Sequence, residues 1–248
     1  SDISDNIVIN SDGITLNGND HEVVVLPTYL GQGRSYMSDV PAISSIGKNN
    51  LTVENLIIKT WYCGICFDDV SNTLIQNNHL IGTTPINWPD ANHGYNGIHS
   101  GGIDGTNNLI KNNLLENVAR VSINVKNGIV DGNTITSHLP SEGVSIMTHG
   151  NSEIQNNITD NKFEVYGKNN KIHDNTLTWW STVSSGENKA ISWHNNLLES
   201  NKILNSDDGW ILFGGKYADM APDGGNYYSD TVGCLDENYD NVCDFEYT

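Results

Sequence analysis

The chain has 248 residues, and its 30 acidic residues against 12 Lys and Arg give a formal net charge of −18. A field of that sign repels nucleic acids and anionic membranes, and it favours cations or neutral ligands as partners. No stretch approaches 18 consecutive apolar residues and the first residues lack an apolar signal core, so we expect a mature or trimmed chain that does not insert into a membrane.

A short phrase recurs along the chain: an aliphatic residue, two polar residues, an Asn, one spacer and a second aliphatic residue. Its copies begin at Val53, Ile75, Ile110, Val130, Ile154, Ile172 and Leu198. The Asn that marks each copy falls at 55, 78, 113, 133, 157, 175 and 201, so most steps are 18 to 26 residues and one is 35. Repeats of this size indicate a solenoid.

A second phrase alternates apolar and polar residues over four to six positions. Its copies begin at Gly64, Gly97, Val121, Val144, Ala190 and Trp210. Alternation of this length predicts strands, and no segment carries a sustained helical stripe. Asn and Gly tolerate a left-handed backbone at the corners between strands, and an inward Asn can satisfy buried backbone groups from rung to rung. The sequence therefore predicts an all-β chain, a single-stranded right-handed parallel β-helix of about 7 to 9 rungs with almost no helix.

The alternation places Ile65 and Phe67 on one side of their strand and Cys66 on the other. Cys63 and Cys66 form a CxxC pair, but neither a thioredoxin-like βαβ pattern nor a second zinc-spaced pair accompanies it. We therefore expect a local disulfide or two unlinked thiols rather than a catalytic pair.

The 35-residue step leaves about a dozen surplus residues, which we expect to leave the β-helix as a loop over 83–97. Long loops on a rigid scaffold are where ligands usually bind. The loop holds four residues suited to stacking on and binding a sugar ring: Trp88, Asp90, His93 and Tyr95. The alternative is a lid that only covers the flank of the β-helix.

The outward positions of the alternating strands supply candidate catalytic groups. If Ile65, Ile98, Val121, Val144 and Ile191 point inward, then His99 points outward, and Asp68, Asn124 and His194 share the outward column two residues further on. Carboxylates and imidazoles on one face of a sheet are the groups that general acid–base catalysis uses. We expect Asp68, His99, Asn124 and His149 to be catalytic and His194 to bind substrate; the alternative is that each faces solvent without a role.

The C-terminal segment 226–248 is predicted to be a calcium-binding cap on the β-helix of residues 1–225. It offers oxygens at the spacing of a calcium loop, from Asp236, Asn238, Asp240, the Val242 carbonyl and Asp244. Cys234 and Cys243 bracket this loop, and Tyr247 stands where a complete EF-hand carries Glu. We expect one structural Ca²⁺; the alternative is a solvated acidic tail.

Two segments resemble a known superfamily. GGNYYSDTVGCLDENYDNVCDFEY, from Gly224, looks like the Gly-Asn-Tyr-Trp-Ser-Asp ending of periplasmic copper-maturation-type and other surface β-helix proteins, although Tyr228 replaces the usual Trp. DNIVINSDGITLNGNDHEV, from Asp5, resembles the first rung of the carbohydrate-binding and sugar-hydrolase β-helices of the pectate-lyase-like superfamily. The resemblance implies the β-helix fold, and the superfamily includes hydrolases, lyases, epimerases and adhesins.

Together these observations predict a secreted protein, extracellular, at the cell surface or periplasmic, that engages a glycan. The leading hypothesis is a polysaccharide-degrading enzyme of hydrolase or lyase type. The alternative is a non-catalytic adhesin or structural carbohydrate-binding protein. The sequence leaves the sugar and the oligomeric state open.

Overall fold

The computed structural model describes residues 2–25, 40–83, 96–101, 105–118, 121–137, 144–165, 170–177, 191–194, 197–198 and 227–228. These residues form strands β1 to β24 and contain no helix. Accordingly, the described part of the chain has no helix that could cross a membrane. The strands belong to three sheets, which we number in the order in which the chain first enters them.

Sheet 1 has seven strands: β1 (Ile7–Val8), β4 (Ile43–Ile46), β7 (Ile65–Asp68), β10 (Asn96–Gly101), β13 (Val121–Val125), β16 (Val144–Thr148) and β19 (Lys162–Val165). Sheet 2 has eight: β2 (Thr15–Asn17), β5 (Thr52–Glu54), β8 (Leu74–Gln76), β11 (Asn108–Lys111), β14 (Gly128–Asp131), β17 (Glu153–Gln155), β20 (Asn170–His173) and β22 (Ile191–His194). Sheet 3 has nine: β3 (Glu22–Val25), β6 (Ile57–Thr60), β9 (His79–Gly82), β12 (Leu114–Val118), β15 (Thr134–Ser137), β18 (Ile158–Thr159), β21 (Thr176–Leu177), β23 (Leu197–Leu198) and β24 (Tyr227–Tyr228).

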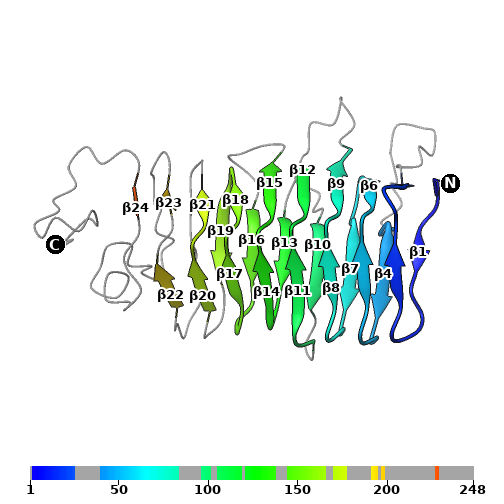
Figure 1. Cartoon of the computed structure of the whole chain (residues 1–248), viewed down its shortest axis with the longest axis horizontal. Coiled ribbons are helices and arrows are strands. Elements are labelled where there is room, and N and C mark those ends of the chain that lie inside the picture. The colour runs from blue at the N-terminus through cyan, green and yellow to red at the C-terminus, as the bar shows by residue number, and fades with distance from the viewer. Residues whose placement is uncertain are drawn as a thin grey trace, which may run out of the picture.

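The chain passes through the three sheets in turn, so that each rung contributes one strand to each sheet. Strands on successive rungs pair in parallel, as β7, β10 and β13 do. Seven complete rungs, from β1–β3 to β19–β21, stack along the long axis shown in Figure 1, with the N-terminus at one end. Parallel crossover connections are right-handed in about 98% of cases. The right-handed parallel β-helix that the sequence predicts is confirmed, and the seven complete rungs agree with the expected 7 to 9.

The repeated aliphatic residues form the core. In sheet 2, Val53, Ile75 and Ile110 align in register and have no exposed surface. Ile65 and Ile98 align in the same way in sheet 1, and both are also fully buried. Because successive strand residues point to opposite faces, fixing these residues inward turns their neighbours outward, where a ligand can reach them.

A ladder of Asn side chains joins the rungs at the corner between sheets 2 and 3. Asn78 donates through Nδ2 to Oδ1 of Asn113 at 3.1 Å, Asn113 donates to Asn133 at 3.0 Å, Asn133 to Asn157 at 3.0 Å and Asn157 to Asn175 at 2.9 Å. All five residues are at most 2% exposed. The inward Asn predicted from the repeats is therefore a continuous hydrogen-bonded column.

The residue before each ladder Asn has a left-handed backbone, which Asn, Asp and Gly tolerate. These corner residues are Asn77, Asn112, Gly132, Asn156 and Asp174, with φ between 53° and 65°. Asn55, which the repeat pattern placed in the ladder, is instead such a corner residue with φ of 54°. Leu56 follows it, and its N–H donates to Oδ1 of Asn78 at 3.1 Å. Asn201 lies outside the described residues.

Candidate active site

The outward face of sheet 1 carries two rows of side chains that run along the axis of the β-helix. The first row contains Ser44, Cys66, His99, Asn124, Met147 and Glu164. The second row, two residues further along the chain, contains Ile46, Asp68, Lys126 and His149, and Gly101, which has no side chain, stands between Asp68 and Lys126. Residues two apart on a strand point to the same side. The four expected catalytic residues therefore share one face.

Asp68 and His99 form a hydrogen-bonded pair on this face. His99 Nε2 lies 3.0 Å from Asp68 Oδ1. The Asp68 side chain is 56% exposed and that of His99 24% exposed. The other ring nitrogen, His99 Nδ1, is buried and has no hydrogen-bond partner among the described residues. Asp68 is thus the group that a ligand can reach, and the less exposed His99 fixes the position of the Asp68 carboxylate through this hydrogen bond.

His149 follows β16 and reaches the surface at the far end of the second row. Partial burial, and then the charges of His99 and Lys126, lower the pKa of His149 below its ordinary 6.5. The imidazole is therefore neutral at neutral pH. A neutral imidazole can accept a proton or a hydrogen bond, so His149 suits the role of a base or of a ligand contact.

The separation along the row decides which groups can act together. Asp68 lies on β7 and His149 follows β16, three strands away in sheet 1. Neighbouring strands lie about 4.8 Å apart, so the two residues are separated by about 14 Å. Acid and base groups that act on one glycosidic bond lie within about 9.5 Å of each other. Asp68 and His149 therefore do not act together on one glycosidic bond.

The register corrects two expected placements. Asn124 aligns with His99 and Cys66, not with Asp68, because Ile123 rather than Val121 stands opposite Ile98. The backbone of His194 lies in sheet 2, where it pairs with that of His173, so it does not share the face of Asp68. Asn124 still neighbours the Asp68–His99 pair, whereas His194 belongs to a different surface.

The loop residues Trp88, Asp90, His93 and Tyr95 lie outside the described residues. So do the expected calcium ligands Asp236, Asn238, Asp240, Val242 and Asp244. The disulfide between Cys63 and Cys66 is present, which confirms the first of the two expected states of that pair. Within the described ranges no group of three or more His, Cys, Asp and Glu side chains could hold a metal ion.

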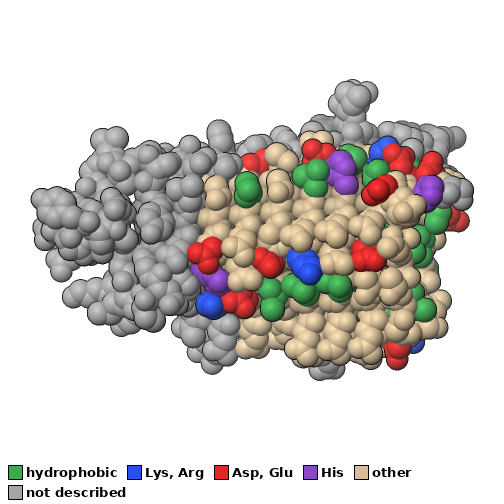
Figure 2. Space-filling model, viewed as in Figure 1, with side chains coloured by type: hydrophobic (Ala, Val, Ile, Leu, Met, Phe, Trp, Pro, Cys, Tyr) green, Lys and Arg blue, Asp and Glu red, His purple; other side chains and the backbone are tan. Residues whose placement is uncertain are grey.

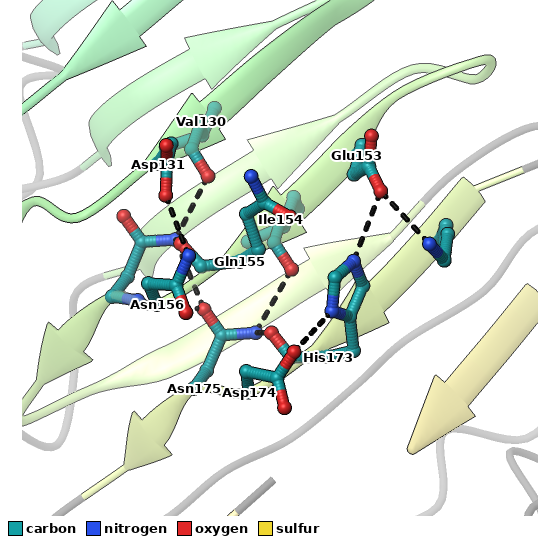
Figure 3. A network of polar contacts seen from close by, with 11 residues as sticks. Val130, Asp131, Glu153, Ile154, Gln155, Asn156, His173, Asp174 and Asn175 are labelled. Atoms are coloured by element: carbon teal, nitrogen blue, oxygen red, sulfur yellow. Dashed lines mark hydrogen bonds and ion pairs between the residues drawn. The ribbon is translucent and has the colours of Figure 1, made fainter. Parts of the chain in front are cut away.

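Sequence reasoning missed a second polar cluster, on the outward face of sheet 2. His173 contacts Glu153 through Nε2 at 3.0 Å and Asp174 through Nδ1 at 2.6 Å, and Lys171 contacts the same Glu153 oxygen at 3.0 Å (Figure 3). These bonds from His173 and Lys171 lower the pKa of Glu153. Since carboxylates occupy both ring nitrogens of His173, the ring has no nitrogen left to offer a substrate. The alternation itself was the available signal, because it places Glu153, Lys171 and His173 outward.

Polar rows are a general property of this surface. On the face shown in Figure 2, charged side chains follow one another along the axis beside a row of hydrophobic side chains. Leu74, Leu109 and Ile129 align in the hydrophobic row of sheet 2. A third His–carboxylate pair, His79 with Glu116 at 2.6 Å, lies on sheet 3.

Comparison with known proteins does not assign the chain to a family. No protein-family model matches the chain, and a search of curated proteins found no significant match. Among solved structures, the chain is similar to the crystal structure of an alginate lyase from Paenibacillus sp. str. FPU-7, with a TM-score of 0.41 and 14% sequence identity over 82% of this chain and 94% of that chain. The functional conclusion therefore depends on the site itself.

Proposed function

We propose that this β-helix is a polysaccharide-degrading enzyme whose reaction centre is Asp68, positioned by His99, on the outward face of sheet 1. The observation that supports it is the 3.0 Å hydrogen bond between an exposed carboxylate and a mostly covered imidazole. Rows of polar side chains along a straight solenoid also suit an extended polymer, which can contact several rungs at once.

The geometry assigns different roles to the residues of this centre. The exposed Asp68 carboxylate acts as acid, base or nucleophile at the sugar. His99 is a positioning residue, since Nε2 contacts Asp68 and Nδ1 is buried. Asn124, next to His99 in the first row, offers an amide to sugar hydroxyls. Lys126 and His149 contact the polymer further along the axis. The formal charge of −18 favours a neutral glycan.

The test is a screen of the purified chain against a polysaccharide panel, with reducing ends and unsaturated products measured in parallel. These two readouts separate hydrolysis from elimination. With an active substrate, Asp68→Asn should lower kcat by at least about 100-fold, the usual contribution of a general acid or base. His99→Gln should lower kcat less and change its pH profile.

His79→Gln is the matched control, because it removes one partner of a similar surface pair on another sheet. His79 and Glu116 are 34% and 41% exposed. Turnover should be unchanged in this variant. If Asp68→Asn also leaves turnover unchanged, the reaction centre lies elsewhere.

A non-catalytic adhesin or spacer is the second candidate, and one observation favours it. Similar pairs occur on all three sheets: Asp68 with His99, Glu116 with His79, and Glu153 with His173. Because such a pair recurs on every face, joining the rungs can be its whole role. In that case the chain binds a glycan without cutting it, and Asp68→Asn and His79→Gln lower the unfolding free energy equally.

We also propose the structural Ca²⁺ site at Asp236, Asn238, Asp240, the Val242 carbonyl and Asp244, and an extracellular, cell-surface or periplasmic location. The spacing of the oxygen donors supports the first proposal. The Cys63–Cys66 disulfide supports the second, because disulfides persist in oxidising compartments.

A further inference from the structure

The Cys63–Cys66 disulfide lies directly beside the Asp68–His99 pair. Cys66 is on the outward face of β7, two residues before Asp68, and it aligns with His99 on β10. Cys66 is partly exposed, whereas Cys63, just before the strand, is only 1% exposed. A reagent from solvent therefore meets the Cys66 sulfur first, next to an imidazole.

The second nitrogen of the His99 ring, Nδ1, is covered from solvent. Nε2 contacts Asp68 on β7, so the ring leans from β10 over β7, which lies about 4.8 Å away. Cys66 projects from that same face of β7. His99 Nδ1 is buried without a hydrogen-bond partner among the described residues. A thiol at Cys66 is the neighbouring group in register that can provide that partner.

We propose that Cys63–Cys66 is a redox-active disulfide, and that its reduction by a dithiol makes Cys66 a reactive thiolate paired with the imidazolium of His99. Asp68 orients the ring from its other nitrogen, so the reduced site has the order carboxylate, imidazole, thiolate. Such an arrangement activates cysteine, because the thiolate is the nucleophile and a neighbouring imidazolium stabilises it. This activity uses the same Asp68 and His99 as the proposed glycan site, but it does not require glycan turnover.

The exchange proceeds in two steps, with the dithiol as the reductant. One thiolate of the dithiol attacks Cys66 Sγ, the bond between Cys66 and Cys63 breaks, and Cys63 leaves as a thiolate that takes a proton from water. In the mixed disulfide, the first sulfur of the dithiol is bonded to Cys66 Sγ. The second thiolate of the dithiol attacks that first sulfur and releases Cys66 as a thiolate. The dithiol leaves as its cyclic disulfide, having transferred two electrons to the protein.

The surroundings allow the bond to open without loss of the rung. The two cysteines are three residues apart, and disulfides that close such short loops stabilise a fold least. Strand β7 is paired on both sides, with β4 and β10. At Gly64, between the cysteines, an added Cβ would lie 2.7 Å from the Gly97 carbonyl oxygen. The turn is thus fitted closely to the next rung and keeps Cys66 beside His99.

The experiment uses the full chain in dithiothreitol buffers of graded redox ratio, with iodoacetamide alkylation and peptide mass spectrometry to follow each cysteine. Reduction should proceed while the far-ultraviolet circular dichroism stays native. Cys66 should alkylate before Cys63. The rate of Cys66 alkylation should rise with pH, and the midpoint of this rise should lie about one pH unit lower in the wild type than in His99→Gln, because an adjacent cation stabilises the thiolate.

Three variants make the outcome decisive. Cys63→Ala leaves a permanent thiol at Cys66 and should reproduce the wild-type profile without reductant. Asp68→Asn should raise the midpoint, because it removes the carboxylate that orients the His99 ring through Nε2. His79→Gln should leave the midpoint unchanged. The proposal is overturned if the disulfide opens only when the chain unfolds, or if His99→Gln and the wild type have the same profile.

Discussion

Replacement of Asn133 by Ala tests how far the Asn ladder stabilises the β-helix. Asn133 has no exposed surface. Its Oδ1 accepts hydrogen bonds from the backbone N–H and the side chain of Asn113, at 2.9 and 3.0 Å. Its Nδ2 donates to the carbonyls of Ile110 and Asp131, at 3.0 and 3.3 Å, and to Oδ1 of Asn157 at 3.0 Å. The change to Ala removes all five contacts.

The loss of stability depends on which partners of Asn133 keep another hydrogen bond after the change to Ala. Asn157 Oδ1 still accepts from the backbone N–H of residue 133, and the Asp131 carbonyl still accepts from the N–H of Asn112. The N–H of Asn113 has no such substitute, and a buried donor left unpaired costs about 1–3 kcal/mol. With about 1 kcal/mol net for each of the better bonds, we expect a loss of about 3–5 kcal/mol. For a chain of this size a loss of 4 kcal/mol corresponds to a Tm lowered by about 8–16 °C.

The assay is urea and thermal unfolding followed by far-ultraviolet circular dichroism. Gln155→Ala is the control, since that side chain points outward from the neighbouring rung, and surface changes of this kind alter stability by about 0.5 kcal/mol or less. A loss below about 1 kcal/mol for Asn133→Ala, close to that of the control, would refute the conclusion that the ladder is a main source of stability.

Four further predictions concern two titratable groups, one glycine and the proposed calcium site. The pKa of Glu153 is lowered in the folded state, so stability should fall as the pH drops below the ordinary 4.5, and Glu153→Gln should weaken this dependence in urea unfolding curves. The pKa of His149 is also lowered, so the folded state should lose stability as the pH falls through 6.5; an NMR titration of the His149 ring should show a midpoint below that value. Gly97→Ala should lower stability by about 1–3 kcal/mol in urea titrations, because the added Cβ would lie 2.6 Å from the Ser122 carbonyl oxygen. Calcium at about 100 times its dissociation constant should raise the unfolding free energy by about 2.7 kcal/mol, and Asp240→Ala should remove most of the effect of a chelator on Tm.

The sequence predicts the parts of the fold that repeat in sheet 2. Ile75, Ile110 and Val130 were aligned correctly because each is followed at a constant distance by its ladder Asn. That distance is constant because the corner between sheets 2 and 3 has the same length from β5–β6 to β20–β21, whereas the first corner, between β2 and β3, is two residues longer. The outward position of His99 follows from alternation alone, since its neighbour Ile98 is the apolar residue that must be buried.

The register of sheet 1 cannot be predicted from the sequence, for a physical reason. A strand has a side-chain period of two, so a shift by two residues leaves the inward and outward pattern unchanged. Val121 and Ile123 are both apolar and both buried, and only the pairing with Ile98 distinguishes them. His194 was misplaced because all three sheets use short alternating strands, so that its sheet depends on the lengths of the preceding corners.

The ladder also makes the chain tolerant of insertion. Asn78 and Asn113 are 35 residues apart and are joined at 3.1 Å, while Asn157 and Asn175 are 18 residues apart and are joined at 2.9 Å. The Asn–Asn hydrogen bond between successive rungs thus forms whatever the number of residues between the two Asn. Doubling a loop costs only about 0.6 kcal/mol of closure entropy. The connections from sheet 3 to sheet 1, such as the one between β9 and β10, are therefore suitable points for grafting foreign peptides, and new binding loops can evolve there while the rungs above and below keep their register.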